Sequence, residues 1–201
     1  MDHRSGPDVG IEGREHLDEA QRLGRGVIVL TGHLGNWELG ATMIRRMGLP
    51  ISVVALQHAD GHLNRLFNRQ RQRCGIEVIP LGGGAARRSL ACLREGGVLG
   101  LLGDLEFGTH GITATLFGRQ ITLPSGPAML SARSRAPIVP SFLLRESPQR
   151  FRLVFESPIR PEIQRETAAD PVESLTRAYA AVLERYLSHA PTQWLIFQPV
   201  T

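Results

Sequence analysis

The sequence predicts an α/β protein, a single domain with a mostly parallel sheet flanked by helices and an antiparallel hairpin near the C-terminus. Short apolar runs alternate with helical patterns from Val27 to Leu102, which is the βαβ rhythm of a parallel sheet. Two later strand-like runs are joined by a Ser147-Pro148-Gln149 turn, as in a hairpin. No repeat or low-complexity linker interrupts the 201 residues, so we expect one domain over 1–201, with a core at about 9–195 and a frayed segment at 1–8.

The first half of the chain alternates helix and strand. A helix is expected from Arg14 to Leu23, because Leu17, Ala20 and Leu23 recur at helical spacing before Gly24. The following segments repeat the alternation, with strands expected at 27–30, 51–56, 77–81 and 98–102 and helices at 37–47, 61–74 and 85–95.

The second half begins with a segment at 108–118 that we expect to be a loop with short extended pieces. A helix over 123–134 and the hairpin strands 138–145 and 151–156 follow. Asp170 and Pro171 form a strong helix start, an N-cap followed by a proline at the first helical position. This last helix runs to about His189 and carries a core stripe at helical spacing.

The composition favours anionic partners. All 23 basic residues are arginine, and the formal net charge is +4. Phospholipid head groups, acidic carrier proteins and nucleic acid all fit this charge, but no RNP-type, helix-turn-helix or zinc-finger signature supports nucleic acid. The two cysteines, Cys74 and Cys92, sit in helical patterns and are expected to be buried free thiols in a reducing compartment. No apolar run approaches 18 residues and no signal peptide is visible, so no transmembrane helix is expected.

A turn after the first apolar strand carries the main functional candidates. His33 leaves the carboxyl end of that strand, where open α/β sheets bind ligands. Asn36 is placed as the N-cap of the next helix, which puts Glu38 in its first turn. We expect the turn to bring the two side chains together, so that Glu38 accepts the Nδ1 proton of His33 and leaves Nε2 free as a base. The alternative is a structural histidine beside a helix-capping glutamate.

Several motifs in order carry a resemblance to a known family. The string His33-Leu-Gly-Asn-Trp-Glu38 resembles the His-x4-(Asp/Glu) box of the glycerolipid acyltransferases, with the filling of the lipid A late acyltransferases and of the similar phosphatidylinositol mannoside acyltransferases. Matching blocks follow, namely Leu102-Gly-Asp104, Phe117-Gly-Arg119, Ala136-Pro-Ile-Val-Pro140 and Pro191-Thr-Gln-Trp194. The likeness runs from about Val9 to Trp194, with Gly103 for alanine and Leu116 for phenylalanine as mild departures.

The resemblance implies an O-acyltransferase that moves a fatty acyl chain from a thioester, on acyl carrier protein or coenzyme A, to a hydroxyl of a glycolipid or lysophospholipid. In this reading His33 is the general base, Glu38 orients and charges it, and no metal or redox cofactor is needed. The oxyanion would be held by amides of the turn over 32–35 or by an arginine.

The candidate substrate-binding residues are Gly35, Asn36, Arg71 and Asp104. Arg71 matches the family's Arg-x3-Gly position, which is suggested to hold acceptor phosphate or the catalytic pocket, and its alternative is a solvated helix face. Asp104 is expected to mark a buried polar site near His33, and its alternative is a strand-end cap.

The resemblance also implies a peripheral enzyme on the cytoplasmic side of the inner membrane, although such proteins usually carry an N-terminal membrane helix that this sequence does not show. Two other functions stay open. One is a metal-dependent hydrolase that uses His33, Asp104 and His110, and the other is a non-catalytic lipid-binding module.

Overall fold

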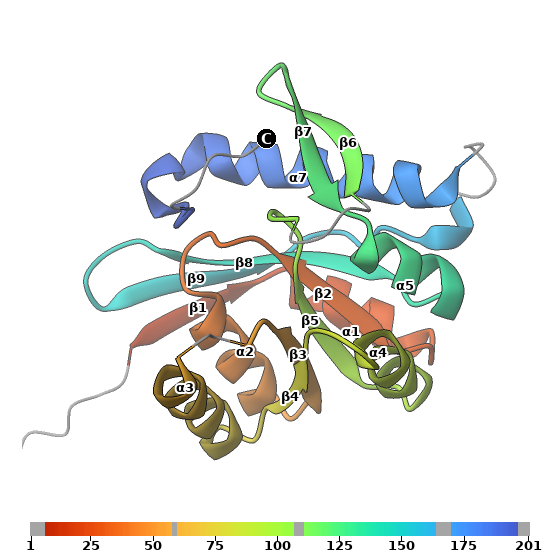
Figure 1. The fold of residues 1–201 in the computed structure, drawn as a ribbon. Coiled ribbons are helices and arrows are strands. Elements are labelled where there is room, and N and C mark those ends of the chain that lie inside the picture. The colour runs from red at the N-terminus through yellow and green to blue at the C-terminus, as the bar shows by residue number, and fades with distance from the viewer. Residues whose placement is uncertain (1–6, 58–59, 107–110, 164–169, 197–201) are drawn as a thin grey trace, which may run out of the picture.

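A seven-stranded sheet forms the centre of the computed structural model, which describes residues 7–57, 60–106, 111–163 and 170–196. Its strands are β1 (Asp8–Glu12), β2 (Val27–Thr31), β3 (Ile51–Ala55), β4 (Glu77–Pro80), β5 (Val98–Leu102), β8 (Ile138–Arg145) and β9 (Arg150–Phe155). They lie in the order β1-β9-β8-β2-β5-β3-β4. Only β8 and β9 pair antiparallel, and every other neighbouring pair is parallel (Figure 1), so the α/β fold class and the late hairpin are confirmed.

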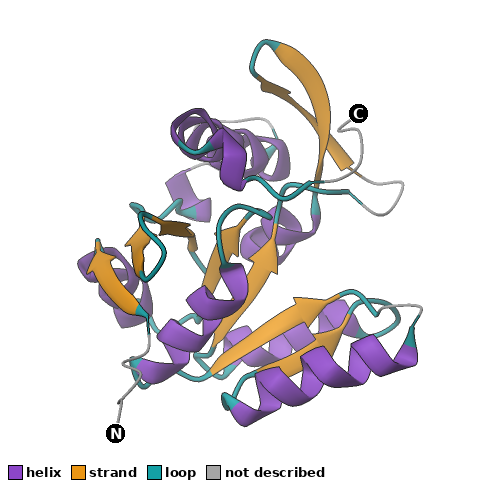
Figure 2. Cartoon of the chain, turned by 90° about the vertical axis from the view of Figure 1, so that its left-hand side faces the viewer, coloured by secondary structure: helices purple, strands orange, loops and turns teal. Residues whose placement is uncertain are grey.

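Helices cover both faces of the sheet (Figures 1 and 2). They are α1 (Arg14–Arg22), α2 (Trp37–Arg46), α3 (Gly61–Arg73), α4 (Ala85–Arg94), α5 (Gly126–Ser134) and α7 (Pro171–His189). The central strand β2 shows why both layers are needed, since Val27 and Val29 pack into the core under α1 and α2, whereas Ile28 and Leu30 pack under α4, α5 and α7. These four side chains are at most 5 % exposed, which is why the strand reads as a continuous apolar run.

The segment at 108–118, expected to be a loop with short extended pieces, is more regular than predicted over its described residues 111–118. Strands β6 (Gly111–Leu116) and β7 (Arg119–Pro124) form an antiparallel hairpin that packs on α7. Its two-residue turn has positive φ at both positions, 51° at Phe117 and 72° at Gly118, as a type I′ turn requires. A phenylalanine at the first position hid this turn, because that turn usually takes asparagine, aspartate or glycine. Helix α5 accordingly begins at Gly126, three residues later than expected.

The N-terminal segment also differs from expectation. Residues 1–6 lie outside the described part of the chain, but Asp8 is not frayed, because β1 pairs in parallel with the edge strand β9. Val9 and Ile11 are the only apolar residues of this strand, too few to show a pattern. The long-range pairing therefore makes a strand that the local sequence does not reveal.

Several expectations about local structure are confirmed. Asp170 caps α7 by accepting hydrogen bonds from the backbone N–H groups of Val172 (2.8 Å) and Glu173 (3.3 Å). Both cysteines are free thiols, although each is only partly buried. In the described residues no helix is long and apolar enough to cross a membrane.

Candidate active site

His33 lies in the turn that follows the central strand β2. Its imidazole Nδ1 is 2.8 Å from Oδ1 of Asp104, and its backbone N–H donates to Oδ2 of the same carboxylate at 2.7 Å. Asp104 comes two residues after β5, the strand that pairs with β2 in parallel, so both residues leave the sheet at the same edge. The expected buried polar group near His33 is thus confirmed.

The Asp104 carboxylate is fully buried and accepts three hydrogen bonds. The third donor is the indole Nε1 of Trp194, 3.0 Å from Oδ2. Because a carboxylate only accepts, Nδ1 of His33 must carry its proton toward Asp104, which leaves the lone pair on Nε2. The His33 side chain is 19 % exposed, and its ring packs edge-to-face with the Trp37 ring, with the two ring centroids 5.0 Å apart. A substrate group can therefore reach the histidine, whereas it cannot reach the aspartate.

Glu38 was expected to accept the Nδ1 proton, and this pairing is wrong. Its carboxylate instead forms a two-pronged ion pair with Arg71, in which Arg71 Nε donates to Oε2 at 3.0 Å and Nη2 donates to Oε1. Asn36 ends the turn as the N-cap, and the helix that starts at Trp37 carries Glu38 toward α3 rather than back over His33. The acidic residue of the box therefore belongs to the wall of the site.

Arg71 is held from several sides. Its side chain is only 13 % exposed, its Nη1 donates to Oδ1 of Asn68 at 3.3 Å, and its guanidinium lies 6.0 Å from the centre of the Phe67 ring. These contacts exclude the alternative of a freely solvated arginine. Its role in binding substrate stays a prediction.

Gly35 and Asn36 have clear structural roles. Gly35 has φ of 68°, and a Cβ atom there would lie 1.9 Å from the carbonyl oxygen of Leu143. The Asn36 N–H donates to that same oxygen at 2.9 Å, and its Oδ1 accepts from Leu39 N–H at 3.0 Å. The turn is therefore pressed against β8. Direct substrate contacts from these two residues stay predictions.

The Pro191-Thr-Gln-Trp194 block closes the site from the far end of the chain. The Gln193 side chain bonds both backbone groups of Arg145, accepting from N–H at 2.8 Å and donating to C=O at 3.0 Å. Its own carbonyl accepts from Gly35 N–H at 3.0 Å, and Leu195 N–H donates to His33 C=O at 2.7 Å. The sequence pointed to this block only through the resemblance, and its function is to hold the His33 turn and to supply the Trp194 donor.

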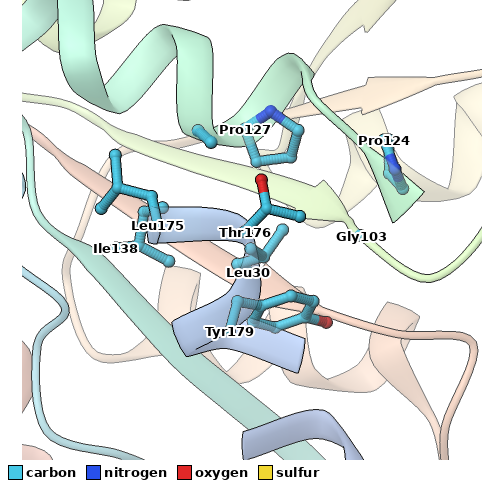
Figure 3. Close-up of a pocket in the computed structure, with 9 residues that line it drawn as sticks. Leu30, Gly103, Pro124, Pro127, Ile138, Leu175, Thr176 and Tyr179 are labelled. Carbon is cyan, nitrogen blue, oxygen red and sulfur yellow. The ribbon is translucent and has the colours of Figure 1, made fainter. Parts of the chain in front are cut away.

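The wall behind Asp104 is apolar and tightly packed. A cavity of about 10 Å³ lies there, and the residues that line it include Leu30, Gly103 and Tyr179 (Figure 3). A Cβ atom on Gly103 would lie 2.8 Å from Leu30 Cδ1 and 2.9 Å from Tyr179 Cε1, so an alanine at this position would force a neighbour to move. The Tyr179 hydroxyl has no hydrogen-bond partner in the described part of the chain, and burial, with the nearby charge of Asp104, raises its pKa well above the usual value.

Metal ligation finds no support in the described residues, which contain no group of three or more His, Cys, Asp or Glu side chains that could hold an ion. The hydrolase alternative depends on His110, which lies outside the described residues. Asp60 and His62 are likewise structural, because Asp60 caps α3 by accepting from His62 N–H at 2.7 Å.

An open α/β sheet that sets a histidine on a buried carboxylate at the carboxyl ends of its strands defines a His–Asp acid–base site. Comparison with known families then assigns the chain: it belongs to the bacterial lipid A biosynthesis acyltransferases, whose pattern it matches over residues 1–200. The suspected family is confirmed.

Curated relatives agree with this assignment. A phosphatidylinositol mannoside acyltransferase of Mycolicibacterium smegmatis is 28 % identical over 99 % of this chain and 64 % of its own length. The protein of the same description from Mycobacterium tuberculosis strain H37Rv is 27 % identical over 96 % of this chain and 60 % of its own. A lipid A biosynthesis acyltransferase of Haemophilus influenzae is 25 % identical over 91 % and 56 %. The chain thus spans only about 60 % of the length of these relatives.

Substitution of Gly35 tests how firmly the turn is pressed on β8. Gly24 also has positive φ, 66°, but its Cβ would meet nothing within 4 Å. Gly24→Ala should therefore destabilise the fold by about 1 kcal/mol, the backbone cost alone. Gly35→Ala adds a collision with the Leu143 carbonyl and should lower the free energy of unfolding by at least about 2 kcal/mol more. Denaturant unfolding of both variants measures the difference, and equal losses would show that the turn can move away from β8.

Proposed function

We propose that this chain catalyses O-acyl transfer from a fatty acyl thioester to a hydroxyl of a glycolipid acceptor. The observation that carries the proposal is the orientation of His33, whose Nδ1 faces the buried Asp104 carboxylate and whose Nε2 is left for substrate. Family membership supports the same reaction class. We assign to Asp104 the role first given to Glu38, which is to orient His33 and to stabilise its charged form.

The proposed reaction starts with the acceptor hydroxyl at Nε2 of His33. Nε2 takes the hydroxyl proton as the oxygen attacks the thioester carbonyl carbon, and a C–O bond forms. Asp104 stabilises the imidazolium that results, because its carboxylate lies 2.8 Å from Nδ1. When the tetrahedral intermediate collapses, the C–S bond breaks and the imidazolium returns its proton to the departing thiolate. Atoms and charge balance, and no metal or redox cofactor is required in this scheme.

The hydrogen bonds of the turn limit which backbone amides could stabilise the oxyanion. The amide of His33 donates to Asp104, and the amide of Gly35 donates to Gln193. Two of the four amides at positions 32–35 are therefore engaged. Any backbone contribution from this turn has to come from Gly32 or Leu34, and an arginine side chain remains the other candidate donor.

The Glu38–Arg71 pair is proposed to form the acceptor side of the pocket. It joins the first turn of α2 to α3 next to Trp37, whose ring contacts His33. The Nε–Nη2 edge of Arg71 is taken by Glu38, and its remaining Nη1 and Nη2 N–H groups are proposed to face an anionic group of the acceptor. The proposed donor is a thioester on acyl carrier protein or coenzyme A, and the proposed location is peripheral, on the cytoplasmic face of the inner membrane.

The decisive experiment supplies purified protein with an acyl thioester and mixed lipid acceptors, and identifies the products by mass spectrometry. Ester formation supports acyl transfer. Binding of lipid without consumption of thioester would instead support the lipid-binding module, and activity that disappears on chelation would support the metal-dependent hydrolase.

Paired substitutions test which carboxylate works with the histidine. His33→Ala and Asp104→Asn should each lower kcat by about 10²–10⁴-fold, because one removes the base and the other removes the acceptor that fixes its tautomer. The double variant should resemble His33→Ala alone, since groups that act together are strongly non-additive.

Glu38→Gln is the matched control for that cycle. It should lower kcat less than Asp104→Asn does. In a variant that carries both substitutions, the two losses in kcat should be additive as free energies. If Glu38→Gln were instead non-additive with His33→Ala while Asp104→Asn was additive, the assignment of Asp104 would be wrong. Circular dichroism on each variant separates loss of chemistry from loss of fold.

Arg71→Ala should raise KM for an anionic acceptor more than KM for the thioester donor, because the guanidinium proposed to face the acceptor is lost. Arg94→Ala, at the exposed end of α4, provides the control. Steady-state kinetics with a phosphate-bearing acceptor and with an uncharged one measure the effect. An equal rise for both acceptors would assign Arg71 to the support of Glu38 alone.

A further inference from the structure

Helix α3 presents an unusual outer face. None of its residues is buried, and Leu63 and Leu66 are 47 % and 61 % exposed. These leucines are three residues apart, so they lie on one side of the helix, and Arg69 and Arg73 continue the same side at three and seven residues beyond Leu66. The segment over 61–73 contains no Asp or Glu.

The orientation of α3 is fixed by its other side. There Arg71 pairs with Glu38, and the Arg71 backbone carbonyl accepts from Ile76 N–H at 3.0 Å. Leu63 and Leu66 therefore point away from the core because the inner side is already anchored. The leucines cannot be buried by a small rotation of the helix without breaking the ion pair.

The apolar exposure continues at the same end of the sheet. Leu56 and Leu81, 50 % and 44 % exposed, follow directly after β3 and β4. Because β2, β3 and β4 run parallel, these leucines leave the sheet at the edge where His33 follows β2. The exposed leucines and the histidine thus share one side of the molecule.

The arginines of this face are not neutralised. In the described residues Arg69 and Arg73 are exposed and have no ion pair, so both charges are available to an anionic partner of this face. A helix that carries exposed leucines beside unpaired arginines matches the interface of an anionic bilayer, where leucine enters the acyl boundary and arginine reaches lipid phosphate. A surface of acidic side chains alone would pair with the arginines but would offer the leucines no apolar contact, whereas an anionic bilayer offers both.

We infer that Leu63, Leu66, Arg69 and Arg73, the α3 outer face, dock on an anionic lipid bilayer. The inference rests on the proposed function in one respect, because it names the bilayer as the source of the acceptor lipid. The Glu38–Arg71 pair ties this face to α2, whose Trp37 contacts His33. Docking through α3 therefore brings the His33 turn to the bilayer surface.

Sedimentation with phosphatidylglycerol–phosphatidylcholine vesicles tests the surface. Arg69→Gln/Arg73→Gln should weaken binding by about 25-fold at low salt, about five-fold per arginine, and should remove most of its salt dependence. Leu63→Gln/Leu66→Gln should weaken binding by at least about ten-fold at any salt. Met129→Gln/Arg133→Gln is the matched control, because it removes an exposed apolar and an exposed basic residue from α5 on the opposite layer.

Activity assays keep the inference separate from the proposed function. With a short-chain, water-soluble acceptor and no vesicles, both α3 variants should retain the wild-type rate and melting temperature, whereas their rate on vesicle-embedded acceptor should fall with binding. Unchanged vesicle binding in both α3 variants would overturn the inference, as would a loss of self-association instead of vesicle binding, which would assign this face to a second copy of the chain. Wild-type protein that binds vesicles through this face but consumes no thioester would support docking and refute acyl transfer.

Discussion

Burial of the Asp104 carboxylate is the constraint on which the site depends. A charge without partners in the interior costs several kcal/mol, so the fold has to bring it donors. Those donors are the backbone and imidazole of His33 and the indole of Trp194, which are distant from Asp104 and from each other in the sequence. The same contacts that satisfy the charge fix the tautomer and direction of the histidine. Precise placement of the base therefore follows from the same contacts that fold the chain around this carboxylate.

Local pattern was enough to predict the sheet but not the partner of the histidine. The apolar run of β2, the N-cap at Asn36 and the capped start of α7 each carry their signal within a few residues, and all are confirmed. The β6–β7 hairpin and β1 were missed because one has an unusual turn residue and the other exists only through pairing with β9.

The choice between Glu38 and Asp104 was also beyond local pattern. Glu38 is near His33 in sequence, but the helix that begins between them turns it away, whereas Asp104 arrives 71 residues later on the neighbouring parallel strand. Only the order of strands in the sheet decides this, and a motif read along the chain contains no strand order. Glu38 nevertheless has a structural role in the His-x4-(Asp/Glu) box. A carboxylate in a first helical turn suits the helix dipole, and here it also holds Arg71 and so fastens α3 to the site.

The bond from Trp194 to Asp104 has a consequence for biosynthesis. Trp194 follows Asp104 by 90 residues, so a ribosome exposes β2, β5 and the histidine turn long before it exposes the indole. A nascent chain that has emerged only as far as β9 can build most of the sheet, yet its buried carboxylate is one donor short and the turn lacks its clamp from Gln193. The partly made protein thus carries all its acid–base groups without their working alignment. Translation order itself therefore delays the final alignment of His33 until the chain has been made as far as Trp194.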